Sequence, residues 1–139
     1  RTATVDLEPR TVEAHREWWA ARSGAVAAIV GVATAPRRVV SVAAVSPYKV
    51  RAADRTTVEN SIYVHRDVAG RGVGRRVLTH LLDVARESGF HSVIARIEAS
   101  SAASRSLHAA CGFELVGVER EVGRKFGRWL DVAVMQRML

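Results

Sequence analysis

The feature that most constrains the fold of this chain is a glycine-rich segment, Gly70–Gly74, which has three glycines in five residues and separates two segments of different periodicity. Before it, Thr57–Val64 alternates well enough to predict a β-strand. After it, apolar residues recur at helical spacing as far as Gly89, a residue that suits a helix C-cap. The sequence therefore predicts a strand, a tight turn and an amphipathic helix in immediate succession.

The glycine-rich turn is also a candidate anion-binding site. Backbone N–H groups at a helix N-terminus are uncovered, and the peptide dipoles there favour negative charge. Arg71, Arg75 and Arg76 add positive charge, so hydrogen bonds and Coulomb attraction together would hold a phosphate or pyrophosphate. The alternative is a turn that only makes the strand-to-helix connection, with arginines on a solvated helix face. Spacing alone leaves both interpretations open.

Two common phosphate-binding motifs are excluded at this turn. A Walker A loop ends in Gly-Lys followed by Ser or Thr, whereas Gly74 is followed by Arg75 and Arg76. A dinucleotide-binding fingerprint needs a third glycine where this chain has Arg75. We therefore expect neither P-loop chemistry nor dinucleotide binding.

The remaining elements continue an alternation of strands and helices, and at 139 residues a single domain is expected. In chain order, the pattern predicts a helix over Thr11–Ala21, a hairpin of strands over Ala25–Val32 and Val39–Val45, a strand over Ser92–Ile97, a helix over Ala102–Ala110, and strands over Phe113–Val118 and Trp129–Met138. Two charged segments, Ser46–Arg55 and Glu119–Arg128, are expected to be loops.

Composition narrows the setting and the partners. The longest apolar run, Ala25–Ala33, is shorter than the ~18 residues of a membrane span, so no membrane protein is expected. The single Cys111 cannot form an internal disulfide, and no secretory leader pattern is present, which favours a reducing cytoplasm. The net charge of +7 suggests a polyanionic partner. However, only two of the 21 basic residues are lysines, a bias that a GC-rich genome produces without selection for nucleic-acid binding.

Several segments together resemble a known superfamily, the GNAT N-acetyltransferases, in its acetyl-CoA pyrophosphate loop and in the motif that follows. These segments are Ile62–Val64, Gly70–Gly74, Ala102–Ser104, Leu107-His108 and Gly112-Phe113. Thr57–His65 and Glu121–Val132 further resemble the phosphinothricin and methionine sulfoximine acetyltransferase branch of that superfamily.

The resemblance runs from about Thr2 to the C-terminus and implies one acetyltransferase domain over residues 1–139. The implied fold is α/β, with a mixed, mostly antiparallel central sheet that is splayed at the acetyl-CoA site and flanked by helices. Members of the branch usually begin with a further strand and helix that help to wall the acceptor site, and the resemblance implies that both are absent here. It also implies a homodimer.

Acetyl transfer to an amine requires a neutral nucleophile, stabilisation of the thioester oxygen and a proton for the departing thiolate. The resemblance implies that Glu59 takes the amine proton, directly or through a water, and that His108 protonates the thiolate. A backbone N–H within Ile62–Val64 would stabilise the oxygen. The alternatives are a strand-edge carboxylate paired with Arg55 and a structural or exposed histidine. Cys111 is not expected to be a nucleophile, since direct transfer needs no covalent intermediate.

The binding residues implied by the resemblance fall into two groups. Those expected to bind acetyl-CoA are Ile62, Tyr63, Val64, Gly70, Arg71, Gly72, Val73, Gly74, Arg75 and Ser101. Those expected to hold the acceptor's carboxylate or phosphinate-like group are Lys49, Arg51 and Arg55, with a solvated basic loop as the alternative. Ala69 stands where the family has Arg or Gln, and Ser101 where it usually has Asn, so we expect weakened rather than abolished cofactor binding. Lys125, Phe126 and Trp129 fit a C-terminal signature that shapes the acceptor pocket or the dimer contact, although a core and turn role would explain them equally well.

The sequence is therefore interpreted as an acetyl-CoA-dependent N-acetyltransferase without a metal, acting on the α-amino group of a small glutamate-like amino acid such as phosphinothricin or methionine sulfoximine. Three alternatives stay open. The acceptor could be another small amine, the chain could be a CoA-binding module that has lost transfer, or it could bind nucleic acid through its charge.

Overall fold

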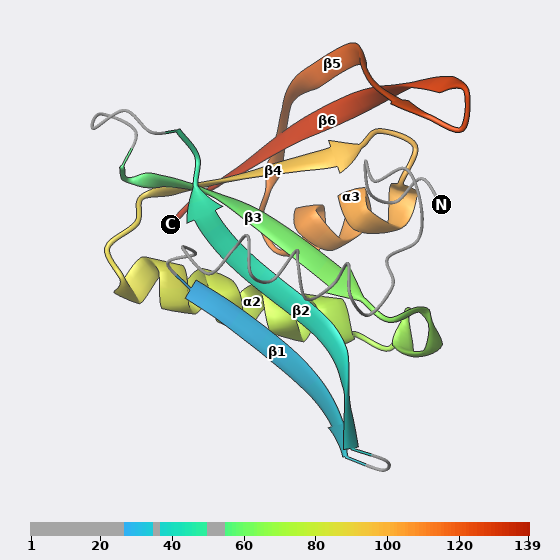
Figure 1. Cartoon of the computed structure of the whole chain (residues 1–139). Helices are drawn as coiled ribbons and strands as arrows, with labels where there is room; N and C mark the ends of the chain where they lie inside the picture. The colour runs from blue at the N-terminus through green and yellow to red at the C-terminus, as the bar shows by residue number, and fades with distance from the viewer. Residues whose placement is uncertain (1–26, 35–36, 50–54) are drawn as a thin grey trace.

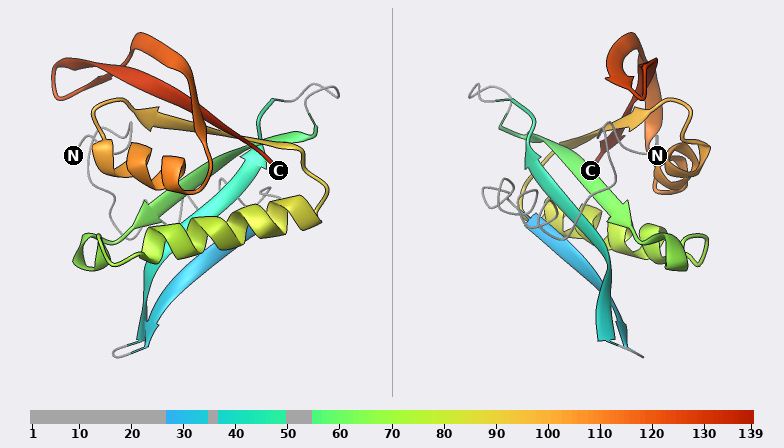
Figure 2. Two further views of the ribbon diagram at one scale, coloured as in Figure 1. Left: turned by 180° about the vertical axis from the view of Figure 1, so that it is seen from behind. Right: turned by 45° about the vertical axis from the view of Figure 1, so that its right-hand side comes forward.

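The computed structural model describes residues 27–34, 37–49 and 55–139, which form one six-stranded sheet with two α-helices (Figures 1 and 2). The elements in chain order are β1 (Ala27–Thr34), β2 (Arg37–Pro47), β3 (Thr57–Val64), a short 3-10 helix η2 (Arg66–Val68), α2 (Val73–Glu87), β4 (Ser92–Glu98), α3 (Ala102–Ala110), β5 (Glu114–Lys125) and β6 (Arg128–Met138). The helix predicted over Thr11–Ala21 lies outside the described residues.

The sheet has the strand order β1-β2-β3-β4-β6-β5. Neighbouring strands are antiparallel except β3 and β4, which are parallel and are joined by the crossover helix α2. A parallel neighbour requires such a crossover, whereas a hairpin joins antiparallel neighbours such as β1 and β2. The predicted mixed, mostly antiparallel sheet and its first hairpin are confirmed.

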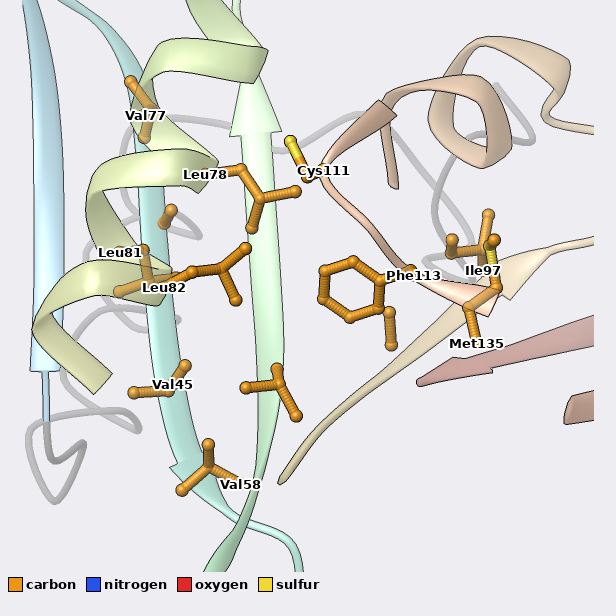
Figure 3. Close-up of a cluster of buried hydrophobic side chains, with 13 residues drawn as sticks. Val45, Val58, Val77, Leu78, Leu81, Leu82, Ile97, Cys111, Phe113 and Met135 are labelled. Atoms are coloured by element: carbon orange, nitrogen blue, oxygen red, sulfur yellow. The ribbon is translucent and has the colours of Figure 1, made fainter. Parts of the chain in front are cut away.

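The hydrophobic core lies between the sheet and α2, with contributions from the segment after α3 (Figure 3). Leu78 and Leu81 of α2 are fully buried, because the helical spacing places them on the face toward the sheet. Val58 of β3, Phe113 just before β5 and Met135 of β6 belong to the same cluster. This packing fixes the N-terminal end of α2 against the end of β3, where the glycine-rich turn lies.

The loop predicted over Glu119–Arg128 is wrong, because β5 continues to Lys125 and β6 begins at Arg128. Its register with β6 shifts between Glu119 and Gly123, which interrupts the alternation that a sequence pattern relies on. β5 is also an edge strand with mostly exposed side chains, and charged residues are common at sheet edges. The charge density that suggested a loop therefore reflects an edge.

Candidate active site

The glycine-rich turn connects the end of β3, through η2, to the start of α2. Gly70 and Gly72 have φ values of +79° and +78°, a region that favours glycine. A Cβ added at either position would meet nothing within 4 Å, so both glycines border open space. Gly74 differs, because its Cβ would lie 3.2 Å from Leu107 Cδ2 and 3.3 Å from Val64 Cγ2. The first two glycines therefore allow the turn, and the third allows α2 to pack closely against β3 and α3.

The N-terminus of α2 has the properties of an anion site. Its N-cap is Gly72, no side chain caps the first turn, and no acidic residue lies there, so the N–H groups that follow Gly72 remain uncapped by side chains. Arg71, Arg75 and Arg76 are exposed around it, and Val73 is half-buried. Arg75 and Arg76 also line a shallow depression with residues further along the exposed face of α2. Backbone donors, open space and flanking arginines together suit a phosphate or pyrophosphate.

The sheet opens beside this anion site. β3 pairs with β4 only from Thr57↔Ser92 to Glu59↔Ile94, whereas β3 continues to Val64 and β4 continues along β6. The two strands therefore separate after Glu59, as Figure 1 shows. The helices α2 and α3 both begin at the end of the molecule toward which β3 runs (Figures 1 and 2). The predicted splay is confirmed.

The backbone of β3 directs N–H groups toward this opening. The N–H of His65 donates to the carbonyl of Val40 on β2, and the carbonyl of Thr57 accepts from Tyr48 on the same side. Because the hydrogen-bonding direction alternates along a strand, the N–H groups of Ile62 and Val64 are directed toward β4, with which they form no register pair. The N–H of Tyr63 is directed to β2. Of the predicted segment Ile62–Val64, two residues therefore direct an N–H group toward the opening.

Glu59 lies on the face of β3 opposite to the helices. Val58 and Asn60 are buried on the helix side, so Glu59 and Ser61 between and beyond them face the other way. Glu59 is half-buried at the last register pair with β4. Since β3 lies between β2 and β4, Glu59 is not at a sheet edge, which removes that part of the alternative interpretation. The carboxylate sits at the point where the opening begins.

His108 is buried in α3 with both ring nitrogens engaged. Its exposed fraction is 2%, its Nδ1 lies 2.7 Å from the carbonyl oxygen of Ser104, and its Nε2 lies 3.3 Å from Nδ2 of Asn60. The ring packs edge-on against Phe113, with centroids 5.0 Å apart. Burial lowers the pKa of His108 below the ordinary value of 6.5, and the hydrogen bond to Ser104 opposes this more weakly. The structure therefore holds a neutral imidazole at this position.

The other predicted binding residues lie at the start of α3 and near the start of β3. Ser101 is the N-cap of α3 and makes no side-chain capping bond. Lys49 and Arg55 are exposed near the start of β3, at the end away from the glycine-rich turn (Figure 1). The ammonium of Lys49 lies 5.0 Å from the centre of the Tyr48 ring. Arg51 lies outside the described residues.

Sequence reasoning missed Asn60. Its side chain is 6% exposed, and its Oδ1 is buried without a hydrogen-bond partner among the described residues. The available signal was a polar residue between Val58 and Ile62, at a position of β3 where the alternation requires an inward-facing side chain. Within the described part of the chain, no cluster of three or more His, Cys, Asp or Glu side chains could hold a metal ion, and no helix is long and apolar enough to cross a membrane.

The chain is similar to known acetyltransferases. Residues 2–113 match the model of the acetyltransferase (GNAT) family. The chain is 37% identical over 135 residues to an L-methionine sulfoximine/L-methionine sulfone acetyltransferase of Pseudomonas paraeruginosa, covering 97% of this chain and 78% of that protein. It is 48% identical over 85 residues to the L-amino acid N-acyltransferase MnaT of Escherichia coli, covering 61% of this chain and 49% of that protein. This second match thus spans about half the length of the relative.

Among solved structures, a GNAT superfamily phosphinothricin acetyltransferase from Sinorhizobium meliloti, in complex with acetyl-CoA, superimposes with a TM-score of 0.87 at 34% identity. The alignment covers 99% of this chain and 75% of that one. The likeness therefore includes the glycine-rich turn and the splayed strands described above.

Proposed function

The chain belongs to the GNAT acetyltransferase family, and on that premise we propose that it transfers an acetyl group from acetyl-CoA to the α-amino group of a small glutamate-like amino acid of the phosphinothricin or methionine sulfoximine type. The observation that carries the proposal is the opening between β3 and β4, bordered at one end by an anion site and at the other by a carboxylate. When bound, acetyl-CoA supplies an acetyl group activated as a thioester.

The residues present suit the phosphate end of acetyl-CoA. The uncapped N-terminus of α2 offers backbone donors, and the open space at Gly70 and Gly72 leaves room for a pyrophosphate. Arg71 and Arg75 add charge. Ala69 lacks the Arg or Gln side chain that the family has at this position. Because the donors named above belong to the backbone, this difference weakens acetyl-CoA binding without removing the site. Ser101, at the start of α3, offers a hydroxyl in place of the usual amide.

The reacting end of the opening contains the groups that acyl transfer needs. The N–H of Ile62 or Val64, directed toward β4, stabilises the thioester oxygen as it gains negative charge. Glu59 accepts a proton from the amine, directly or through a water, so that the nitrogen attacks in its neutral form. The donors lie in the plane of the sheet, whereas the Glu59 side chain lies on the face away from the helices. We therefore propose that the acceptor approaches from that face.

The basic residues before β3 are proposed to bind the acceptor's anionic group. Lys49 and Arg55 are exposed close to the end of β3 at which Glu59 lies, and Arg51 belongs to the same segment of the sequence. A cation at this end holds a carboxylate or phosphinate while the amino group points into the opening. Such an arrangement favours amino acids over simple amines.

We further propose that the protein acts as a homodimer in the cytoplasm, where acetyl-CoA is available. The edge strand β5 exposes Leu115, Val116 and Val122, each by half or more, and Phe126 of the β5–β6 turn and Trp129 of β6 are also exposed. Lys125 beside them is 2% exposed. A long edge strand with apolar side chains favours pairing with another chain. Gel filtration with light scattering tests this, and a monomer at micromolar concentration would contradict it.

The function is tested by following thiol release from acetyl-CoA with methionine sulfoximine and with phosphinothricin. We expect turnover with at least one of them and a loss of about 10²-fold or more in E59Q, because the variant has no base. E114Q, an exposed carboxylate at the start of β5, is the matched control and should stay within about twofold of the wild type.

The alternatives give different results in the same assay. Turnover only with other amines would keep the enzyme class and overturn the acceptor. Binding of CoA without thiol release for any amine would indicate a binding module. Retention on DNA that falls steeply with salt and ignores CoA would favour nucleic acid.

A further inference from the structure

The pair formed by His108 and Asn60 has a defined direction of hydrogen bonding. A carbonyl oxygen only accepts, so the 2.7 Å contact with Ser104 requires the proton of the imidazole to be on Nδ1. The neutral ring then has a lone pair on Nε2, which accepts from Nδ2 of Asn60 at 3.3 Å. This assignment also fixes the amide, because the opposite orientation would bring Oδ1 against an acceptor.

The location of the pair connects it to the reaction. Asn60 follows Glu59, the last residue of β3 in register with β4, and precedes Ile62, the first of the two donors directed into the opening. A hydrogen bond from its side chain to α3 therefore anchors β3 where β4 no longer supports it. The cost of this arrangement is a buried amide oxygen without a partner among the described residues. An apolar residue would avoid that cost, so the bond to His108 is the function that the amide serves here.

We propose that His108 is a positioning residue that holds Asn60, and through it the free segment of β3, and that it does not protonate the departing thiolate. The inference rests on the proposed acetyl transfer. In that reaction Glu59 takes the first proton from the amine and releases it to solvent, the C–N bond forms as the C–S bond breaks, the second proton of the nitrogen passes to Glu59, and the thiolate takes its proton from solvent. Thiols have ordinary pKa values near 8.5, so a thiolate leaves near neutral pH without an acid beside it.

The pair is tested first in the wild-type protein without any ligand. In ¹⁵N-histidine-labelled protein at pH 7.5, long-range ¹H–¹⁵N spectra distinguish the two neutral tautomers and the imidazolium, and the H108Q spectrum assigns the signal. We expect the Nδ1–H tautomer for His108. A proton on Nε2, in either the other tautomer or the imidazolium, would overturn the inference whatever the activity.

The second test compares H108Q with H108F. Glutamine has no titratable proton, yet its amide can accept from Asn60 and donate to Ser104, whereas the phenylalanine side chain can bond to neither. We expect kcat to fall at least about tenfold in H108F and glutamine to restore most of it, with KM for acetyl-CoA changing less than kcat. If His108 were the acid, both variants would lose kcat alike and H108Q would lose the alkaline limb of its pH profile.

N60L and H91F provide the controls. N60L replaces the amide with an apolar side chain of similar size and leaves His108 in place, so it should lower kcat as H108F does. A kcat equal to the wild type would overturn the inference. H91F alters an exposed histidine and should change neither parameter. If the wild type binds CoA but releases no thiol with any amine, the proposed function fails, and the tautomer experiment still decides the state of the pair.

Discussion

Replacing Gly72 with alanine separates a cost to folding from a cost to ligand binding. Gly72 and Gly89 lie at opposite ends of α2, with φ of +78° and +90°, and a Cβ at either would meet nothing within 4 Å. Alanine at either position therefore pays the same backbone penalty, about 1 kcal/mol, without a clash inside the protein. Only Gly72 is the N-cap of α2, so only there is the new methyl group added beside the first-turn N–H groups at which a phosphate would lie.

The expected magnitudes follow from this geometry. Both variants should lose about 1 kcal/mol of unfolding free energy in urea. G72A should also bind CoA about 10- to 100-fold more weakly, because losing one backbone hydrogen bond to a charged oxygen costs about 1.5–3 kcal/mol. Isothermal titration calorimetry with CoA measures this, and G89A should match the wild type. Equal CoA affinity in the two variants would refute the assignment of the α2 N-terminus as the anion site.

Two further predictions concern His108 and Arg137. Since burial lowers the pKa of His108 below 6.5, the unfolded chain binds a proton at this imidazole more readily than the folded protein does. The stability that the neutral ring contributes at neutral pH is therefore lost as pH falls from 6.5 toward the lowered pKa of the folded state. Urea unfolding at a series of pH values should show that H108Q loses less stability below pH 7 than the wild type, by at most about 1.4 kcal/mol per pH unit, and parallel curves would contradict this. Arg137 donates from Nη1 to the carbonyl of Cys111 at 2.6 Å and packs beside Gly112. R137A should therefore lose about 1–3 kcal/mol of unfolding free energy in urea, with CoA affinity unchanged. The control is R128A, an exposed arginine at the start of β6, which should lose under about 0.5 kcal/mol.

Residue periodicity and glycine positions predicted those helices, strands and turns that depend on neighbouring residues in the sequence. The strand, turn and helix over residues 57–87 were predictable because α2 has a strong apolar face and because Gly70 and Gly72 allow the positive φ that the turn needs. The extent of β5 was not, since an edge strand with a shifted register has neither alternation nor a buried face to reveal it. Its length depends on pairing with β6, which no window of the sequence contains.

The sequence predicted the parts of the candidate site that one short segment forms. It did not predict the parts that depend on contacts between residues far apart in the sequence. The glycines and arginines of the turn suggested an anion site as one of two interpretations, and the splay came from the resemblance to a family. The roles of His108 and Asn60 depend on a contact across 48 positions of sequence. Taken alone, a histidine near a predicted thioester site suggests an acid, and its bonds to Ser104 and Asn60 are what indicate otherwise.

The position of Asn60 also explains why the opening can persist in the sheet. A strand that leaves its neighbour exposes N–H and carbonyl groups that need partners and loses the ladder that holds it straight. On its other side β3 remains paired with β2 as far as Val64, which preserves its direction. The bond from Asn60 to His108 adds a tie to α3 just beyond the last pair with β4, and Gly74 brings α2 and Leu107 against Val64 at the far end. The segment between these ties therefore keeps the N–H groups of Ile62 and Val64 directed toward the opening without a register pair to β4, which is the condition for presenting them to a substrate.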